Sequence, residues 1–215
     1  MKKYLISFIS GMALFMLSTH ANADFRVGAT GILGQFETSG SESEKSGDVG
    51  PETNSVSITE RFIGASVFAE VDVGPFVLGV DWVPVDVELG SGRRTDTTTD
   101  GNESSSDSGS YKAEANAENL MTIYAHVPLS MINEYAYLSA GYHYTDVTTT
   151  ETLPNSTYGD DEITGYQLGL GFKGDHVRME AFYSDFDDVS LSSSSGSSSV
   201  TADIDSMGVK LGFNF

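Results

Sequence analysis

Apolar residues recur at every second position in eight separate stretches of this 215-residue sequence, and this period constrains the fold more than any other feature. A β-strand turns successive side chains to opposite faces, so each stretch predicts a strand with one apolar side. The stretches are 24–37, 60–73, 76–82, 111–127, 135–147, 163–173, 176–186 and 208–215. We therefore expect an all-β protein built from eight strands.

The first 23 residues are set apart from these strands. Lys2 and Lys3 precede an apolar run that is shorter than the ~20 residues of a membrane-spanning helix. The run is followed by the small-residue sequence Ala21-Asn22-Ala23. This order predicts a cleaved secretory signal peptide over 1–23 and a single mature domain over 24–215.

The chain is strongly acidic and has no cysteine. Its formal net charge is −20, which disfavours binding to nucleic acid by charge. The absence of cysteine excludes disulfides and thiolate metal sites, so stability has to come from burial and hydrogen bonding.

Short and long connections alternate between the predicted strands. The short ones are 74–75, 128–134 and 174–175, whereas the long ones lie near 38–57, 90–110, 149–161 and 187–199 and are rich in Ser, Thr, Gly and Asp. Tight turns join antiparallel neighbours. Strict alternation therefore predicts an up-and-down antiparallel order, with all long loops at one end and both termini at the other.

The polar face of the strands is rich in glycine and carries few charges of both signs, which suits a crowded barrel interior better than a surface in water. Aromatic residues of the apolar face gather toward the strand ends, as in the girdles of membrane barrels. We therefore expect the apolar face to meet lipid. The alternative is a soluble lipocalin-like binder with apolar side chains inside.

The final strand strengthens the membrane interpretation. Its alternate apolar positions are Met207, Val209, Leu211, Phe213 and Phe215. This ending resembles the signal that the insertion machinery reads in bacterial outer-membrane barrels, and 24–215 as a whole resembles the small OmpA/OmpX-type porin-family barrels. The resemblance implies an eight-stranded antiparallel up-and-down transmembrane β-barrel, monomeric in the outer membrane of a Gram-negative bacterium and in contact with lipid and lipopolysaccharide. It also implies a structural or surface-interaction role.

Charged residues fall on the inward face near the end that carries the short turns. They are Arg26, Glu70, Asp72, Asp81, Arg178, Glu180 and Lys210. Opposite charges in a narrow barrel predict an ion-pair network. The alternative is a narrow ion path, which would make the protein a small channel or porin-like permeation protein.

Three histidines follow the signal peptide, namely His126, His143 and His176, and we expect all three to face the lumen. Because His143 lies several levels away from the others, a shared metal site is not expected. The nearest arrangement to a catalytic one combines His143 with Ser139 and Asp146. No GxSxG motif is present, so we expect no enzyme, catalytic residue or cofactor.

The second long loop has a spacing similar to that of a calcium loop. Asp96, Thr98, Asp100, Gly101 and Asp107 occupy its positions 1, 3, 5, 6 and 12, with Thr at position 3 and Asp at position 12 as departures. Weak divalent-cation binding by all the loops is a second possibility, and its acidic residues include Asp160, Asp161, Glu162, Asp187 and Asp188.

Overall fold

The computed structural model describes residues 24–44, 52–96, 109–152, 157–194 and 198–215. Within these residues the structure is entirely β, and no helix is long and apolar enough to cross a membrane. The strands are β1 (Phe25–Glu44), β2 (Glu52–Val73), β3 (Phe76–Trp82), β4 (Val87–Asp96), β5 (Gly109–Pro128), β6 (Ala136–Glu151), β7 (Asp161–Lys173), β8 (Val177–Ser192) and β9 (Ser198–Asn214). The predicted signal peptide, 1–23, lies outside the described residues.

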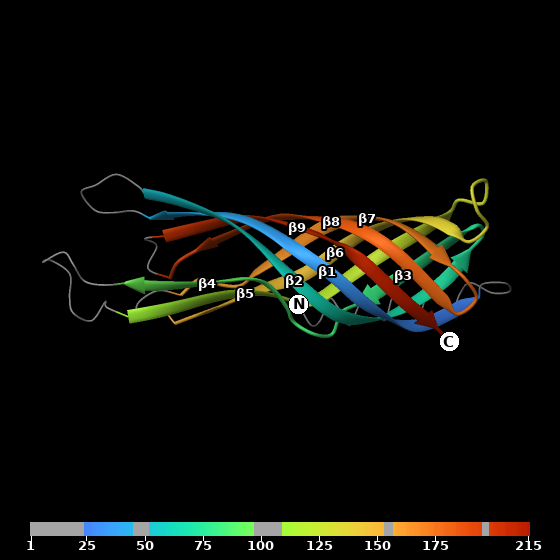
Figure 1. Cartoon of the computed structure of the whole chain (residues 1–215), viewed down its shortest axis with the longest axis horizontal. Helices are drawn as coiled ribbons and strands as arrows, with labels where there is room; N and C mark the ends of the chain where they lie inside the picture. The colour runs from blue at the N-terminus through green and yellow to red at the C-terminus, as the bar shows by residue number, and fades with distance from the viewer. Residues whose placement is uncertain (1–23, 45–51, 97–108, 153–156, 195–197) are drawn as a thin grey trace, which may run out of the picture.

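The strands form one closed antiparallel barrel (Figure 1). Each strand pairs with its neighbour in the chain except β3 and β4, and β9 returns to pair with β1. β3 and β4 occupy one place in the ring, because β3 pairs with one half of β5 and β4 with the other half. The predicted eight-stranded up-and-down barrel is therefore confirmed, with its third strand in two pieces.

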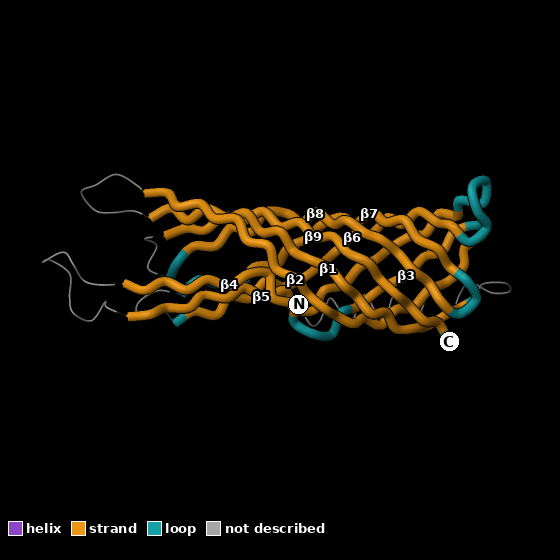
Figure 2. Tube along the Cα trace, viewed as in Figure 1, coloured by secondary structure: helices purple, strands orange, loops and turns teal. Residues whose placement is uncertain are grey.

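The two ends of the barrel differ as the connection lengths predict. The turns at 74–75, 129–135 and 174–176 lie at one end together with Phe25 and Phe215, and we name this the turn end (Figure 2). The other end, the loop end, is where β1 and β2, β4 and β5, β6 and β7, and β8 and β9 are joined, whereas the link between β3 and β4 lies partway along the barrel. Gly74 has a φ of 62°, a left-handed conformation that glycine adopts without steric cost.

The strands continue into the ranges expected as long loops. β1 and β2 remain paired from Phe25↔Val71 to Glu44↔Glu52, although 38–57 is rich in serine and was expected as a loop. β4 likewise extends to Asp96 and pairs with β5 as far as Gly109. Antiparallel pairing satisfies backbone groups whatever the side chains are, so polar composition alone does not end a strand.

Candidate functional site

The outer and inner faces of the wall have the predicted orientations. On the outer face, Val67 and Leu168 are 48% and 61% exposed, and large apolar side chains from every strand of the ring are similarly exposed. On the inner face, Ser66 is 2% exposed and Gly169 is buried. The outer face of the barrel is thus an apolar belt, and the lumen is the place where chemistry could occur.

The turn-end half of the lumen holds an ion-pair network centred on Glu70, which is completely buried. Arg178 and Lys173 both donate to the Glu70 carboxylate. The Tyr124 hydroxyl donates to Glu70 Oε1 at 2.9 Å. Arg26 Nε also lies 3.5 Å from Glu70 Oε2. Because Glu70 gains three cationic partners and a hydroxyl donor, its charge is compensated inside the barrel.

The remaining predicted charges lie around this centre. Arg26 is paired with Asp72, with its Nη1 2.7 Å from Asp72 Oδ2. Lys210 Nζ lies 3.6 Å from Asp81 Oδ2. Glu180 accepts a hydrogen bond from Gln167 Nε2 at 3.1 Å. The ion-pair network predicted from the sequence is therefore present, and Lys173 and Gln167 are members that the prediction did not include.

His126 and His176 have different surroundings. His126 is buried in the network, where its ring stacks between Tyr124 and Tyr137 at centroid distances of 4.7 and 4.1 Å. His176 is exposed in the turn between β7 and β8, so its predicted lumen position was wrong. The reason is a boundary error, because β8 begins one residue later, at Val177.

His143 lies in the lumen but does not form the catalytic arrangement considered above. Its Nδ1 is 2.7 Å from Thr122 Oγ1 and its Nε2 is 2.8 Å from Ser184 Oγ. Asp146 is three residues farther along β6 and therefore lies on the opposite, outer face. The ring also stacks on Phe186, so the contacts of His143 are those of a packed and hydrogen-bonded interior residue.

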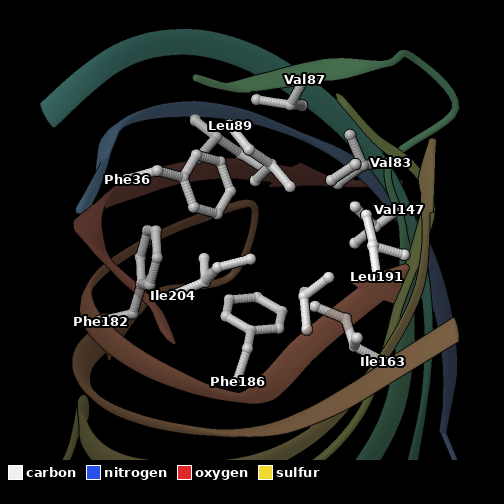
Figure 3. Packing of buried hydrophobic residues seen from close by; sticks show 13 residues of the cluster. Phe36, Val83, Val87, Leu89, Val147, Ile163, Phe182, Phe186, Leu191 and Ile204 are labelled. Carbon is white, nitrogen blue, oxygen red and sulfur yellow. The ribbon is translucent and has the colours of Figure 1, made fainter. Parts of the chain in front are cut away.

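The loop-end half of the lumen is apolar, which the sequence analysis did not predict. Side chains from β1, from the β3–β4 region and from β5 to β9 point toward one another there (Figure 3). We name this set the apolar cluster; its buried members are Ile32, Phe36, Val83, Val87, Leu89, Ala117, Val147, Ile163, Phe182, Phe186, Val189, Leu191 and Ile204. The available signal was the large inward-facing residues Phe36, Phe62, Phe182 and Phe186, which alternate with the outward apolar stripe.

The wall is interrupted beside the apolar cluster. Backbone pairing between β2 and β3 ends at Val67↔Trp82, and within the described residues β4 has no backbone pairing with β2. Pro84 lies in the link between β3 and β4, where it cannot donate a backbone hydrogen bond, and the link leaves the wall partway along the barrel (Figure 2). We name this interruption, between residues 58–66 of β2 and 83–90, the wall break.

Side-chain contacts limit the wall break toward the loop end. The Thr38 hydroxyl donates to the Leu89 carbonyl at 3.0 Å. A Cβ built on Gly90 would lie 3.7 Å from Ile58 Cδ1, so these two residues are in contact range. The wall break is therefore bounded by the Val67↔Trp82 pair on one side and by these contacts on the other.

Carboxylates outside the belt show no metal site in the described part of the chain. Glu118, Asp146 and Glu162 lie in register on β5, β6 and β7. Partial burial and these two neighbouring carboxylates raise the pKa of Asp146, against a hydrogen bond from Asn119 that lowers it.

Most of the calcium-like spacing, 97–108, lies outside the described residues. Weak cation binding at the loops therefore stays a prediction.

No protein-family model and no curated protein matches the sequence. Among solved structures, the chain is similar to the outer membrane protein OprG from Pseudomonas aeruginosa, with 13% identity over 88% of this chain and 97% of that one and a TM-score of 0.45. It is also similar to Neisserial surface protein A, with 12% identity over 88% and 98% and a TM-score of 0.39. It is also similar to the outer membrane protease OmpT from Escherichia coli, with 11% identity over 92% of this chain and 100% of that one and a TM-score of 0.43. Similarity at this level assigns neither a family nor an activity.

Proposed function

We propose that this chain is an integral outer-membrane protein of a Gram-negative bacterium, with the turn end in the periplasm and the loop end outside. The observation that carries the proposal is the apolar belt, which extends over the outside of the closed barrel. An exposed apolar area of this kind is unfavourable in water, whereas a closed barrel satisfies its backbone groups in lipid. The apolar belt on the outside and the buried ion pairs in the turn-end half of the lumen argue against the lipocalin-like alternative, in which the apolar side chains would face inward.

Trp82 gives a direct test, because it is the one tryptophan of the chain and is 43% exposed in the belt. In vesicles, we expect brominated acyl chains to quench its emission and aqueous iodide to have little effect. As a control, the double variant Trp82→Phe with Glu134→Trp moves the indole to an exposed turn residue. It should show the reverse pattern. Iodide quenching of Trp82 without bromolipid quenching would contradict membrane insertion.

We propose that the protein supports the envelope structurally or makes contacts at the cell surface, and that it is not an enzyme. We also propose that it is a monomer and that the insertion machinery assembles it through its C-terminal strand. Ion pairs occupy the turn-end half of the lumen and apolar side chains the loop-end half, an arrangement that supports a plug better than a pore. Planar-bilayer recordings should therefore show no steady conductance. A steady conductance whose ion selectivity changes in Glu70→Ala would instead support a small channel.

A second candidate function is favoured by the wall break. It places the apolar cluster beside the lipid-facing side of the barrel, where small apolar molecules dissolved in the outer leaflet could enter the lumen sideways. Backbone groups left unpaired at membrane depth are tolerated where they line a cavity or are covered by protein. A strand interruption at this place would therefore allow entry from the membrane, which a continuous wall would prevent.

A reversible cross-link tests this second function, because the chain has no native cysteine. The double variant Ile58→Cys with Gly90→Cys joins the two sides of the wall break where they already touch. When the cysteine pair is reduced, we expect bromobenzene to quench Trp82 emission in a saturable way. When the pair is oxidised, quenching should only rise in proportion to the concentration of bromobenzene in lipid. Saturable quenching in both states would contradict entry that requires the two sides of the wall break to separate.

A further inference from the structure

Ser66 lies beside the wall break and has an unsatisfied hydroxyl. It directly precedes Val67, whose pairing with Trp82 is the last backbone pair between β2 and β3. Ser66 faces the lumen and is 2% exposed, yet its Oγ has no hydrogen-bond partner. A buried hydroxyl without a partner loses its bonds to water and gains nothing in exchange, so its position calls for a physical explanation.

Three other hydroxyls on the inner face are satisfied by the protein. Thr30, the cross-strand partner of Ser66, accepts from Arg178 Nη2 at 3.2 Å. Thr122 and Ser184 are both hydrogen-bonded to His143. Ser66 thus differs from these three in leaving a buried hydroxyl free to bind a group that comes from outside the protein.

The side chains around Ser66 indicate what kind of ligand could bring a hydrogen-bonding group to its hydroxyl. Along β2 toward the loop end, the next inward positions are Gly64 and Phe62, and Phe62 packs against the apolar cluster. On the other side of the wall break, Val83 and Val87 are buried members of the cluster. The charged network begins on the turn-end side of Ser66, where Arg178 binds Thr30, whereas the surroundings toward the loop end are apolar and favour an apolar body.

We propose that Ser66 is the hydrogen-bonding contact for small, mainly apolar molecules that carry one hydroxyl group, such as phenols and short aryl alcohols. The inference rests on the second candidate function, since the ligand enters through the wall break. Phe62 and Val83 turn aside to admit its ring, and its hydroxyl reaches Ser66 Oγ. A serine hydroxyl both donates and accepts, so it can bind an alcohol or a phenol in either sense.

A matched pair of probes separates the hydroxyl contact from apolar burial. 4-Bromophenol and 4-bromotoluene have nearly the same shape, and the bromine of each quenches Trp82 on contact. After correction for partition into lipid, we expect 4-bromophenol to reach half-saturation at about tenfold lower concentration than 4-bromotoluene. Ser66→Ala should bring the two values together.

Ser139→Ala is the control, because Ser139 Oγ is also buried without a partner but lies on β6, paired with His126 and away from the wall break. This variant should keep the preference for 4-bromophenol. If Ser66→Ala does not fold, Ser66→Cys keeps the size and weakens the hydrogen bond, and it should reduce the preference.

The outcomes distinguish the inference from the function beneath it. If both probes saturate but 4-bromophenol keeps its advantage in Ser66→Ala, the assignment of Ser66 is wrong and side entry stands. If neither probe saturates in the folded unsubstituted barrel, side entry itself is wrong and the ligand class has no basis.

Discussion

The ring of Tyr124 lies across Gly79, so closely that a Cβ built on the glycine would be 2.3 Å from Tyr124 Cζ. Gly79 is the register partner of both Glu70 on β2 and Tyr124 on β5. Because the glycine has no side chain, the Tyr124 ring can cross β3 and donate its hydroxyl to Glu70. The lumen glycines noted in the sequence thus make room for aromatic rings, as Gly171 does for Tyr137.

Gly79→Ala should destabilise the barrel by about 1–3 kcal/mol, the usual cost of overpacking a filled interior. The added methyl group displaces the Tyr124 ring and weakens its bond to Glu70. Gly92→Ala is the matched control on the same barrel strand, because a Cβ there meets nothing within 4 Å. Urea unfolding in detergent micelles should show a lower midpoint for Gly79→Ala and an unchanged one for Gly92→Ala. Equal midpoints for the two variants would contradict this account of the glycine.

Glu70→Ala should cost about 3–5 kcal/mol, because it leaves the buried Arg178 and the partly buried Lys173 without their carboxylate. The measurement is the free energy of unfolding in the same micelles. Glu134→Ala removes an exposed carboxylate from the turn between β5 and β6 and should change the value by less than about 0.5 kcal/mol. A Glu70 variant as stable as the control would show that the network contributes no net stability.

The strands and the faces of the barrel could be predicted from the sequence because both follow from local rules. A period of two decides which side chains share a face, and Gly-Pro or Gly-Asp pairs mark the tight turns. The charged lumen residues, Glu70 and Arg178 among them, were placed correctly for this reason. In a narrow barrel, charged side chains on the inward face of the strands must meet, so knowing the face of each residue is enough to predict the network.

Depth along the barrel depends on register between distant strands, and the alternation does not contain it. The inner face of β8 carries Arg178 and Glu180 near the turn end and Phe182 and Phe186 farther along, and the same parity describes all four. Leu191 falls in the range 187–199, which was expected as a loop, but it is buried in the apolar cluster, because the β8–β9 bulge between Phe186 and Val189 shifts the parity. The wall break could not be predicted either, since it consists of pairing that is missing between β2 and β4.

Asp146→Asn should stabilise the barrel at pH 7 and have little effect at pH 3. Burial, together with Glu162 and Glu118, raises the pKa of Asp146 in the folded state, so the folded protein holds this proton more tightly than the unfolded chain. The ionised carboxylate therefore lowers stability above its folded pKa. This penalty disappears as the pH falls below the unfolded value of about 3.9. Urea midpoints across this range are the measurement, and Asp160→Asn, an exposed carboxylate, is the control. A stabilisation that persists at pH 3 would need a cause other than charge.

Phe215→Ala should reduce assembly in cells while changing the stability of the refolded barrel little. The Phe215 ring is 85% exposed, and the backbone bond from its N–H to the Val27 carbonyl, 2.9 Å long, does not need the side chain. If the insertion machinery reads the alternate apolar residues of the last strand, removing the closing ring should lower the amount of heat-modifiable barrel in the membrane several-fold. Phe25→Ala is the matched control, because Phe25 is an exposed aromatic at the same end of the barrel but lies on β1. Equal losses for the two variants would indicate that the membrane interface needs both rings, and would argue against a signal specific to the C-terminal strand.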